Sequence, residues 1–94
     1  MIAELAPDRA TQVLTRARAY GESRIVCGVH NWSAVEGGRT NGASVFSALH
    51  GSSEFTAAMA KARQELDAAR KSGAKPDAAG CAKEAELTKP LAVQ

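Results

Sequence analysis

The chain has few of the side chains that build a large core. Its 94 residues include one Trp, one Tyr and two Phe, so aromatic residues make up only 4%. Hydrophobic residues reach 45%, but much of that share is alanine, which buries little area. A domain of this length is marginal even with a good core. We therefore expect the chain to pack against more polypeptide, either a missing N-terminal part of its own domain or a second subunit.

Neither the charge nor the hydropathy of the chain points to nucleic acid or a membrane. Twelve Lys and Arg stand against ten Asp and Glu, for a formal net charge of +2. There is no basic run and no alternation of basic and aromatic residues, so we expect no nucleic-acid partner. No apolar segment approaches the roughly 20 residues of a membrane span. The first residues have neither the basic start nor the apolar core of a signal peptide.

The chain contains two cysteines, Cys27 and Cys81. In an oxidising compartment they would close a long loop and restrict the unfolded chain. As free thiols, Cys27 would be a small core residue instead. The spacing in the sequence does not decide between a disulfide and two free thiols. No set of His, Cys, Asp and Glu has metal-ligand spacing, so we expect no metal ion.

The hydrophobic pattern predicts an all-α fold with three main helices, over residues 8–20, 31–50 and 53–72. Gly21 is expected to end the first of them. Residues 1–73 are predicted to be the helical part of a domain. Residues 74–94 are predicted to be a tail, with a loop, a short helix over about 78–88 and a break at Pro90.

Two glycine-containing segments are ambiguous. Residues 22–29 form either a short strand or a buried turn that leads into the next helix. Gly38 and Gly42 lie four residues apart on one face of the second helix. Each glycine costs a soluble helix about 1 kcal/mol relative to alanine. Either another backbone approaches closely at these glycines, or they weaken the helix without a functional reason.

The most informative segment runs from residue 21 to residue 33. It places Ser23 and Arg24 seven and six residues before His30. The guanidinium fork of an arginine matches phosphate oxygens, and a neutral imidazole can attack phosphorus. This spacing resembles the third signature of the acid phosphatase/vanadium haloperoxidase superfamily, Ser-Arg-x5-His-x3-Asp. The flanking Gly-Glu-Ser-Arg, Cys-Gly-x-His and Val-Glu-Gly-Gly-Arg are most similar to the bacterial class A non-specific acid phosphatases, over roughly residues 5–66.

The resemblance implies a fold, a reaction and a cellular location. The chain would be the C-terminal portion of a helical bundle, and the protein would be periplasmic. His30 would be the nucleophile, hydrolysing phosphomonoesters through a phosphohistidine intermediate without a metal or other cofactor. Arg24 would bind the substrate phosphate, and Ser23 would assist or support the turn. The other two family signatures, Lys-x6-Arg-Pro and Pro-Ser-Gly-His, do not occur, which implies an incomplete fragment.

The chain departs from the family pattern at Ala34, which occupies the position of the family's aspartate. In the family that carboxylate orients the imidazole and stabilises positive charge on it. The nearest acid, Glu36, is expected to point away from His30 on an ideal helix. His50, at the predicted end of the same helix, is expected to be structural.

Two alternatives to phosphatase activity remain open. One is an inactive helical fragment or interaction module, which Ala34 and the two missing signatures favour. The other is a vanadate-dependent haloperoxidase, whose site uses the same histidine to hold vanadate. The Cys-Gly-x-His context fits the phosphatases better.

Overall fold

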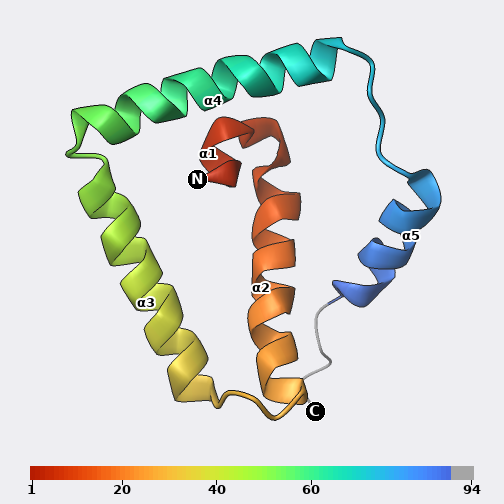
Figure 1. Ribbon diagram of the computed structural model, residues 1–94. Helices are drawn as coiled ribbons and strands as arrows, with labels where there is room; N and C mark the ends of the chain where they lie inside the picture. Colours follow the sequence, from red (N-terminus) through yellow and green to blue (C-terminus); the bar gives the residue numbers. More distant parts are fainter. Residues whose placement is uncertain (90–94) are drawn as a thin grey trace.

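The structure, a computed structural model, describes residues 1–89 and is all-α, as predicted (Figure 1). No strand occurs within that range. None of the helices described there is long and apolar enough to cross a membrane. Its elements are α1 (Ile2–Leu5), the 3-10 turn η1 (Pro7–Arg9), α2 (Ala10–Val26), α3 (Trp32–Leu49), α4 (Ser53–Lys71) and α5 (Ala78–Leu87).

Local signals in the sequence place α3, α4 and α5 to within one or two residues. The Asn31 side chain caps α3 by accepting from the Ala34 amide at 2.9 Å. Ser52 caps α4 by accepting from the amide of Phe55, and Gly73 follows α4 with a φ of +78°. A side-chain oxygen at the N-cap and a glycine just past the last turn are the usual signals for the start and end of a helix. The predicted break at Pro90 lies outside the described residues.

The predicted end of the first helix at Gly21 is wrong, because α2 continues to Val26. Gly21 instead allows a close approach between helices. A Cβ at this position would lie 3.2 Å from Cγ1 of Val35 on α3. The stop signal is Gly28, with a φ of +70°, which only glycine adopts at low cost. Residues 22–29 are thus neither strand nor wholly buried turn, but the last turns of α2 and the link to α3.

We expect Gly21→Leu to separate α2 from α3 and to destabilise the chain by about 1–3 kcal/mol, since the added side chain overpacks the contact with Val35. Thermal unfolding followed by circular dichroism would measure the change. Gly42→Leu is the matched control, because a Cβ at Gly42 meets no atom within 4 Å. The control should be neutral or stabilising. Equal stability of the two variants would contradict the close approach at Gly21.

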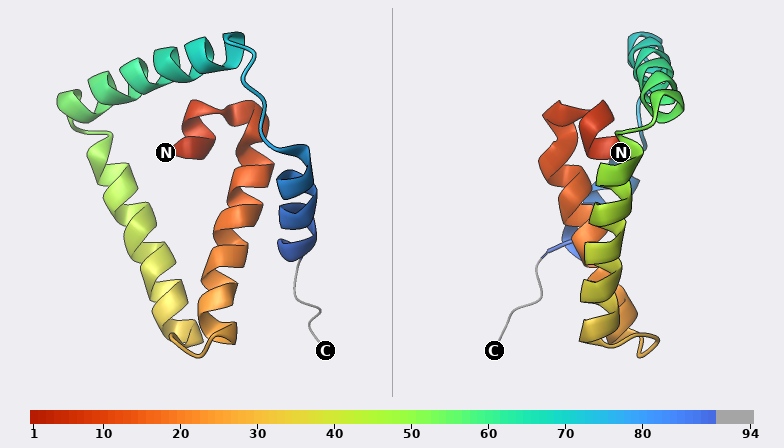
Figure 2. Two further views of the ribbon diagram at one scale, coloured as in Figure 1. Left: turned by 45° about the vertical axis from the view of Figure 1, so that its right-hand side comes forward. Right: turned by 90° about the vertical axis from the view of Figure 1, so that its left-hand side faces the viewer.

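The helices form an open frame rather than a closed bundle. α3, α4 and α5 follow three sides of it and α2 runs inside, with α1 beneath α4 (Figure 1). The side view shows a flat molecule (Figure 2), and its extents are 43 × 37 × 19 Å. The radius of gyration is 16.0 Å, whereas a compact chain of this length would have about 12 Å.

The core is as thin as the composition predicts. Among the described residues only Ala6 and Val35 are buried, at 5% and 8% exposure. The apolar stripe of α4 is only half-buried, at Phe55, Met59 and Leu66. The accessible surface is 7349 Å², roughly 2,200 Å² above what a folded monomer of this mass exposes. An excess of this size is consistent with the expectation that the chain packs against further polypeptide.

The expectation that another backbone approaches Gly38 and Gly42 is not met within this chain. A Cβ built at either position meets no atom within 4 Å. The only close helix approach at a glycine of α2 or α3 in residues 1–89 is at Gly21. Gly38 and Gly42 therefore both face open space among the described residues.

Candidate active site

The link between α2 and α3 fixes the spacing of Arg24 and His30. At the end of α2 the Gly28 amide donates to the carbonyl of Ile25 at 2.9 Å, and the Val29 amide donates to the carbonyl of Arg24 at 3.1 Å. This pair of bonds with glycine in the left-handed conformation is a Schellman motif. The His30 amide also donates to the Arg24 carbonyl, at 3.1 Å. The motif therefore ties the backbone of the predicted nucleophile to that of the predicted phosphate ligand.

Arg24 and His30 line one concavity between α2 and α3. Its volume is about 420 Å³, large enough for a phosphate group. Tyr20, Ala34 and Arg39 are also on its wall. The site thus gathers two guanidinium groups and an imidazole on one side of the frame.

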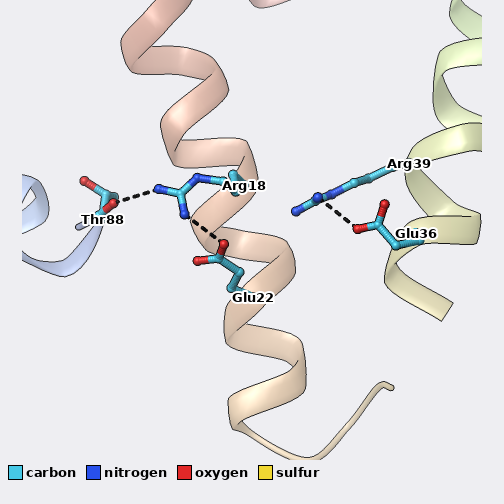
Figure 3. Close-up of polar contacts among 5 residues, drawn as sticks. All are labelled: Arg18, Glu22, Glu36, Arg39 and Thr88. Carbon is cyan, nitrogen blue, oxygen red and sulfur yellow. Dashed lines mark hydrogen bonds and ion pairs between the residues drawn. The ribbon is translucent and has the colours of Figure 1, made fainter. Parts of the chain in front are cut away.

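The Arg24 side chain is held within this wall. Its guanidinium carbon lies 5.4 Å from the centroid of the Tyr20 ring, in cation–π range. Its Nε is buried and has no hydrogen-bond partner among residues 1–89. The neighbouring carboxylate of Glu22 accepts from Arg18 instead, at 2.8 Å (Figure 3). Because Nε is closed to solvent, an anion in the concavity would be bound by the terminal amino groups of Arg24.

The His30 ring has a polar contact with the preceding backbone. Its Nδ1 lies within hydrogen-bond distance of the Val29 carbonyl oxygen. A carbonyl can only accept, so the contact favours a proton on Nδ1, and in a neutral ring with that tautomer the lone pair is on Nε2. The ring is exposed to solvent. A backbone carbonyl thus does part of the orienting that a carboxylate at Ala34 would do, but supplies no full negative charge.

Glu36 does not replace the missing carboxylate. It accepts from Nη1 of Arg39 at 3.0 Å, one turn along α3 (Figure 3). This agrees with the expectation that Glu36 points away from His30. Its position instead fixes the direction in which Arg39 reaches.

Ser23 is the one predicted phosphate-binding residue that the structure does not bring to the concavity. Its hydroxyl donates to the Tyr20 carbonyl at 2.7 Å, within α2. It lines hollows between α2 and α5 together with Ala19 and Leu87. Because Ser23 and Arg24 are adjacent on a helix, their side chains point about 100° apart. Ser23 therefore supports the helix on another face.

Of the two alternatives for the cysteines, the structure shows free thiols and no disulfide. Cys27 and Cys81 are both free and exposed. Cys27 is not a core residue either, since it lies in the exposed turn after α2. The tail is held to α2 by polar contacts instead: Arg16 forms an ion pair with Glu84, and Arg18 donates to the Thr88 carbonyl at 3.4 Å (Figure 3).

His50 is structural, as expected, and it holds the N-terminal segment. Its Nδ1 lies 2.8 Å from the Phe46 carbonyl oxygen and its Nε2 lies 3.0 Å from the Glu4 carboxylate. The bond to the Phe46 carbonyl and the contact with Glu4 raise the pKa of His50 above its ordinary value of 6.5. Arg63 adds a bond to the Glu4 carbonyl at 3.2 Å.

A raised folded-state pKa means that His50 stabilises the chain most at acid pH. The contribution should be complete below about pH 6.5 and should disappear as the pH rises through the raised pKa. We expect His50→Gln to lower the melting temperature at acid pH and to match the parent chain at alkaline pH. Glu4→Gln should reproduce most of this loss. A melting-temperature difference that is the same at all pH values would contradict the ion pair.

Sequence reasoning missed Arg39. The side chain reaches from α3 towards α2, and its Nη2 would lie 3.4 Å from a Cβ on Gly21 (Figure 3). A signal was present: Arg39 follows Val35 by four residues, so both share one face of α3. That face could be recognised as the α2-facing one only once Val35 was known to pack on Gly21.

The comparisons with known proteins agree with the motif. The chain is 44% identical over 77 residues to an acid phosphatase of Zymomonas mobilis, a match that covers 82% of this chain and 29% of that protein. It is 37% identical over 67 residues to the non-specific acid phosphatase of Salmonella typhimurium, which covers 71% of this chain and 27% of the relative. A non-specific acid phosphatase of Providencia stuartii is 30% identical over 66 residues, 70% of this chain and 27% of the relative.

These matches confirm the resemblance: the matched region of the chain is homologous to bacterial acid phosphatases. The chain spans less than a third of the length of these curated relatives. No family model matches it. No solved structure matches it either.

Proposed function

We propose that the chain is the C-terminal part of an acid phosphatase that hydrolyses phosphomonoesters through a phosphohistidine intermediate. The observation that carries the proposal is the concavity shared by Arg24 and His30. Nε2 of His30 would attack phosphorus as the ester P–O bond breaks, and Arg24 would neutralise charge on the phosphoryl oxygens. Water would then cleave the P–N bond and restore the imidazole.

The remaining groups of such a site would come from polypeptide outside this chain. The leaving alkoxide requires a general acid, and the family's general-acid histidine belongs to a signature that this sequence lacks. The excess surface and the two-residue core support a larger domain or a second subunit as the source. A periplasmic location belongs to the same proposal and rests on the resemblance alone.

A second candidate function is a helical interaction module without activity. Ala34 in the aspartate position and the open frame favour it. The two candidates are separated by hydrolysis of an aryl phosphate at mildly acidic pH. A suitable enzyme is a chimaera in which this chain replaces the matching 77-residue segment of the Zymomonas acid phosphatase. Turnover by the chimaera supports the phosphatase, whereas a folded but inactive chimaera supports the module.

A further inference from the structure

The concavity of Arg24 and His30 contains a second guanidinium that is not part of the Ser-Arg-x5-His-x3-Asp signature. Arg39 comes from the opposite wall, on α3, and lines the same concavity. Its Nη2 occupies the space beside Gly21, 3.4 Å from where a Cβ would be. Because Gly21 has no side chain, the guanidinium lies directly against the backbone of α2 (Figure 3).

This position brings the two arginines together. Gly21 and Arg24 are three residues apart on α2, so they share one face of the helix. A guanidinium that lies over Gly21 is therefore about one helical turn from the origin of the Arg24 side chain. Arg24 from α2 and Arg39 from α3 thus line the same concavity, together with His30.

The charges around the concavity favour an anion with more than one negative charge. The charged residues on its wall are the two arginines, and no carboxylate of the described residues lines it. Glu36 binds only Nη1 of Arg39, at 3.0 Å, which leaves the fork with further donors. Arg24 has an unpartnered buried Nε. A phosphoryl dianion would supply acceptors to both forks.

We propose that Arg39 is a second ligand of the substrate phosphate, acting with Arg24, and that Glu36 orients it. The proposal rests on the proposed phosphatase function and deepens it. It means that this chain by itself holds two of the cationic donors of the site. The ligand class is a phosphomonoester dianion or inorganic phosphate, bound with its oxygens divided between the two guanidinium forks.

The test is binding of inorganic phosphate to the 94-residue chain, followed by NMR shifts of the His30 and Gly28 amides at constant ionic strength. We expect saturable binding that weakens about tenfold in Arg39→Ala, the usual effect of losing a charge-assisted contact. Arg39→Lys should recover only part of it, because lysine keeps the charge but loses the fork. Arg70→Ala is the matched control: it removes an arginine that pairs with Asp8 at 3.1 Å, away from the concavity.

The outcomes separate this inference from the proposed function. If Arg24→Ala weakens phosphate binding and Arg39→Ala does not, Arg39 is not a ligand, while the phosphatase assignment stands. If the parent chain shows no saturable shift at His30, the phosphate site proposed for this chain is wrong as a whole. If Arg39→Ala and Arg70→Ala weaken phosphate binding equally, the loss reflects the lower net charge, and Arg39 is not a phosphate ligand. Unchanged helix content by circular dichroism shows that each variant is folded.

Discussion

The isolated chain is expected to hydrolyse p-nitrophenyl phosphate no faster than buffer at mildly acidic pH, whereas the Zymomonas chimaera should turn it over. Phosphoryl transfer depends on positioning and on several charge-stabilising donors acting at once. In the proposed site the chain would contribute a nucleophile and two arginines but no general acid. Groups that act as a unit lose nearly all their effect when the set is incomplete.

Within the chimaera, His30→Ala should abolish turnover, with a loss of about a thousandfold or more, because no covalent intermediate can form. Arg70→Ala, on α4 and outside the concavity, should retain the parent rate. Release of p-nitrophenolate measures both. Turnover by the isolated chain that is lost on His30→Ala would contradict the incomplete-site argument. Full activity of the His30→Ala chimaera would contradict the nucleophile assignment.

The parts of the fold that could be predicted are those whose signals are local. α4 begins at a serine cap, carries one apolar stripe and ends before Gly73, and each of these features lies within the helix or next to it. The course of α2 could not be predicted in the same way. A glycine at position 21 predicts a helix end, but α2 continues through it. Gly21 lies within the helix, where it approaches Val35 on α3.

The candidate site also has parts that depend on local sequence and parts that depend on contacts between helices. That His30 and Arg24 lie near each other was predictable, because only six residues of sequence separate them and the Schellman motif between them is itself local. The place of Arg39 in the concavity was not, since it depends on which face of α3 meets α2. The contact of His50 with Glu4 could not be predicted either, because the two residues are 46 positions apart in the sequence.

Ser23 illustrates a different limit. A resemblance carries a residue over with its neighbours, but adjacent positions on a helix point to different sides. The structure places Ser23 against the Tyr20 carbonyl and Arg24 in the concavity. The family motif therefore points to a segment, while the helix geometry decides which of its side chains line the concavity.

Ala34→Asp in the chimaera is expected to raise turnover by roughly a hundredfold. Ala34 lies four residues after His30 and lines the same concavity. In this chain Nδ1 of His30 lies within hydrogen-bond distance of the Val29 carbonyl, which can orient the ring but offers only a partial charge. A carboxylate would in addition stabilise the imidazolium that forms as Nε2 bonds to phosphorus, the kind of contribution a buried aspartate makes in triad-type sites.

Ala34→Asn is the matched control, because it has nearly the shape of aspartate without the charge. We expect it to leave turnover within about threefold of the parent, since orientation of the ring is already provided by Val29 and the amide adds no charge. An equal gain in both variants would assign the effect to ring orientation rather than to charge. No gain in Ala34→Asp, in a chimaera that is active and loses activity on His30→Ala, would mean that the carbonyl of Val29 is sufficient. The aspartate of the family signature would then be dispensable at this site.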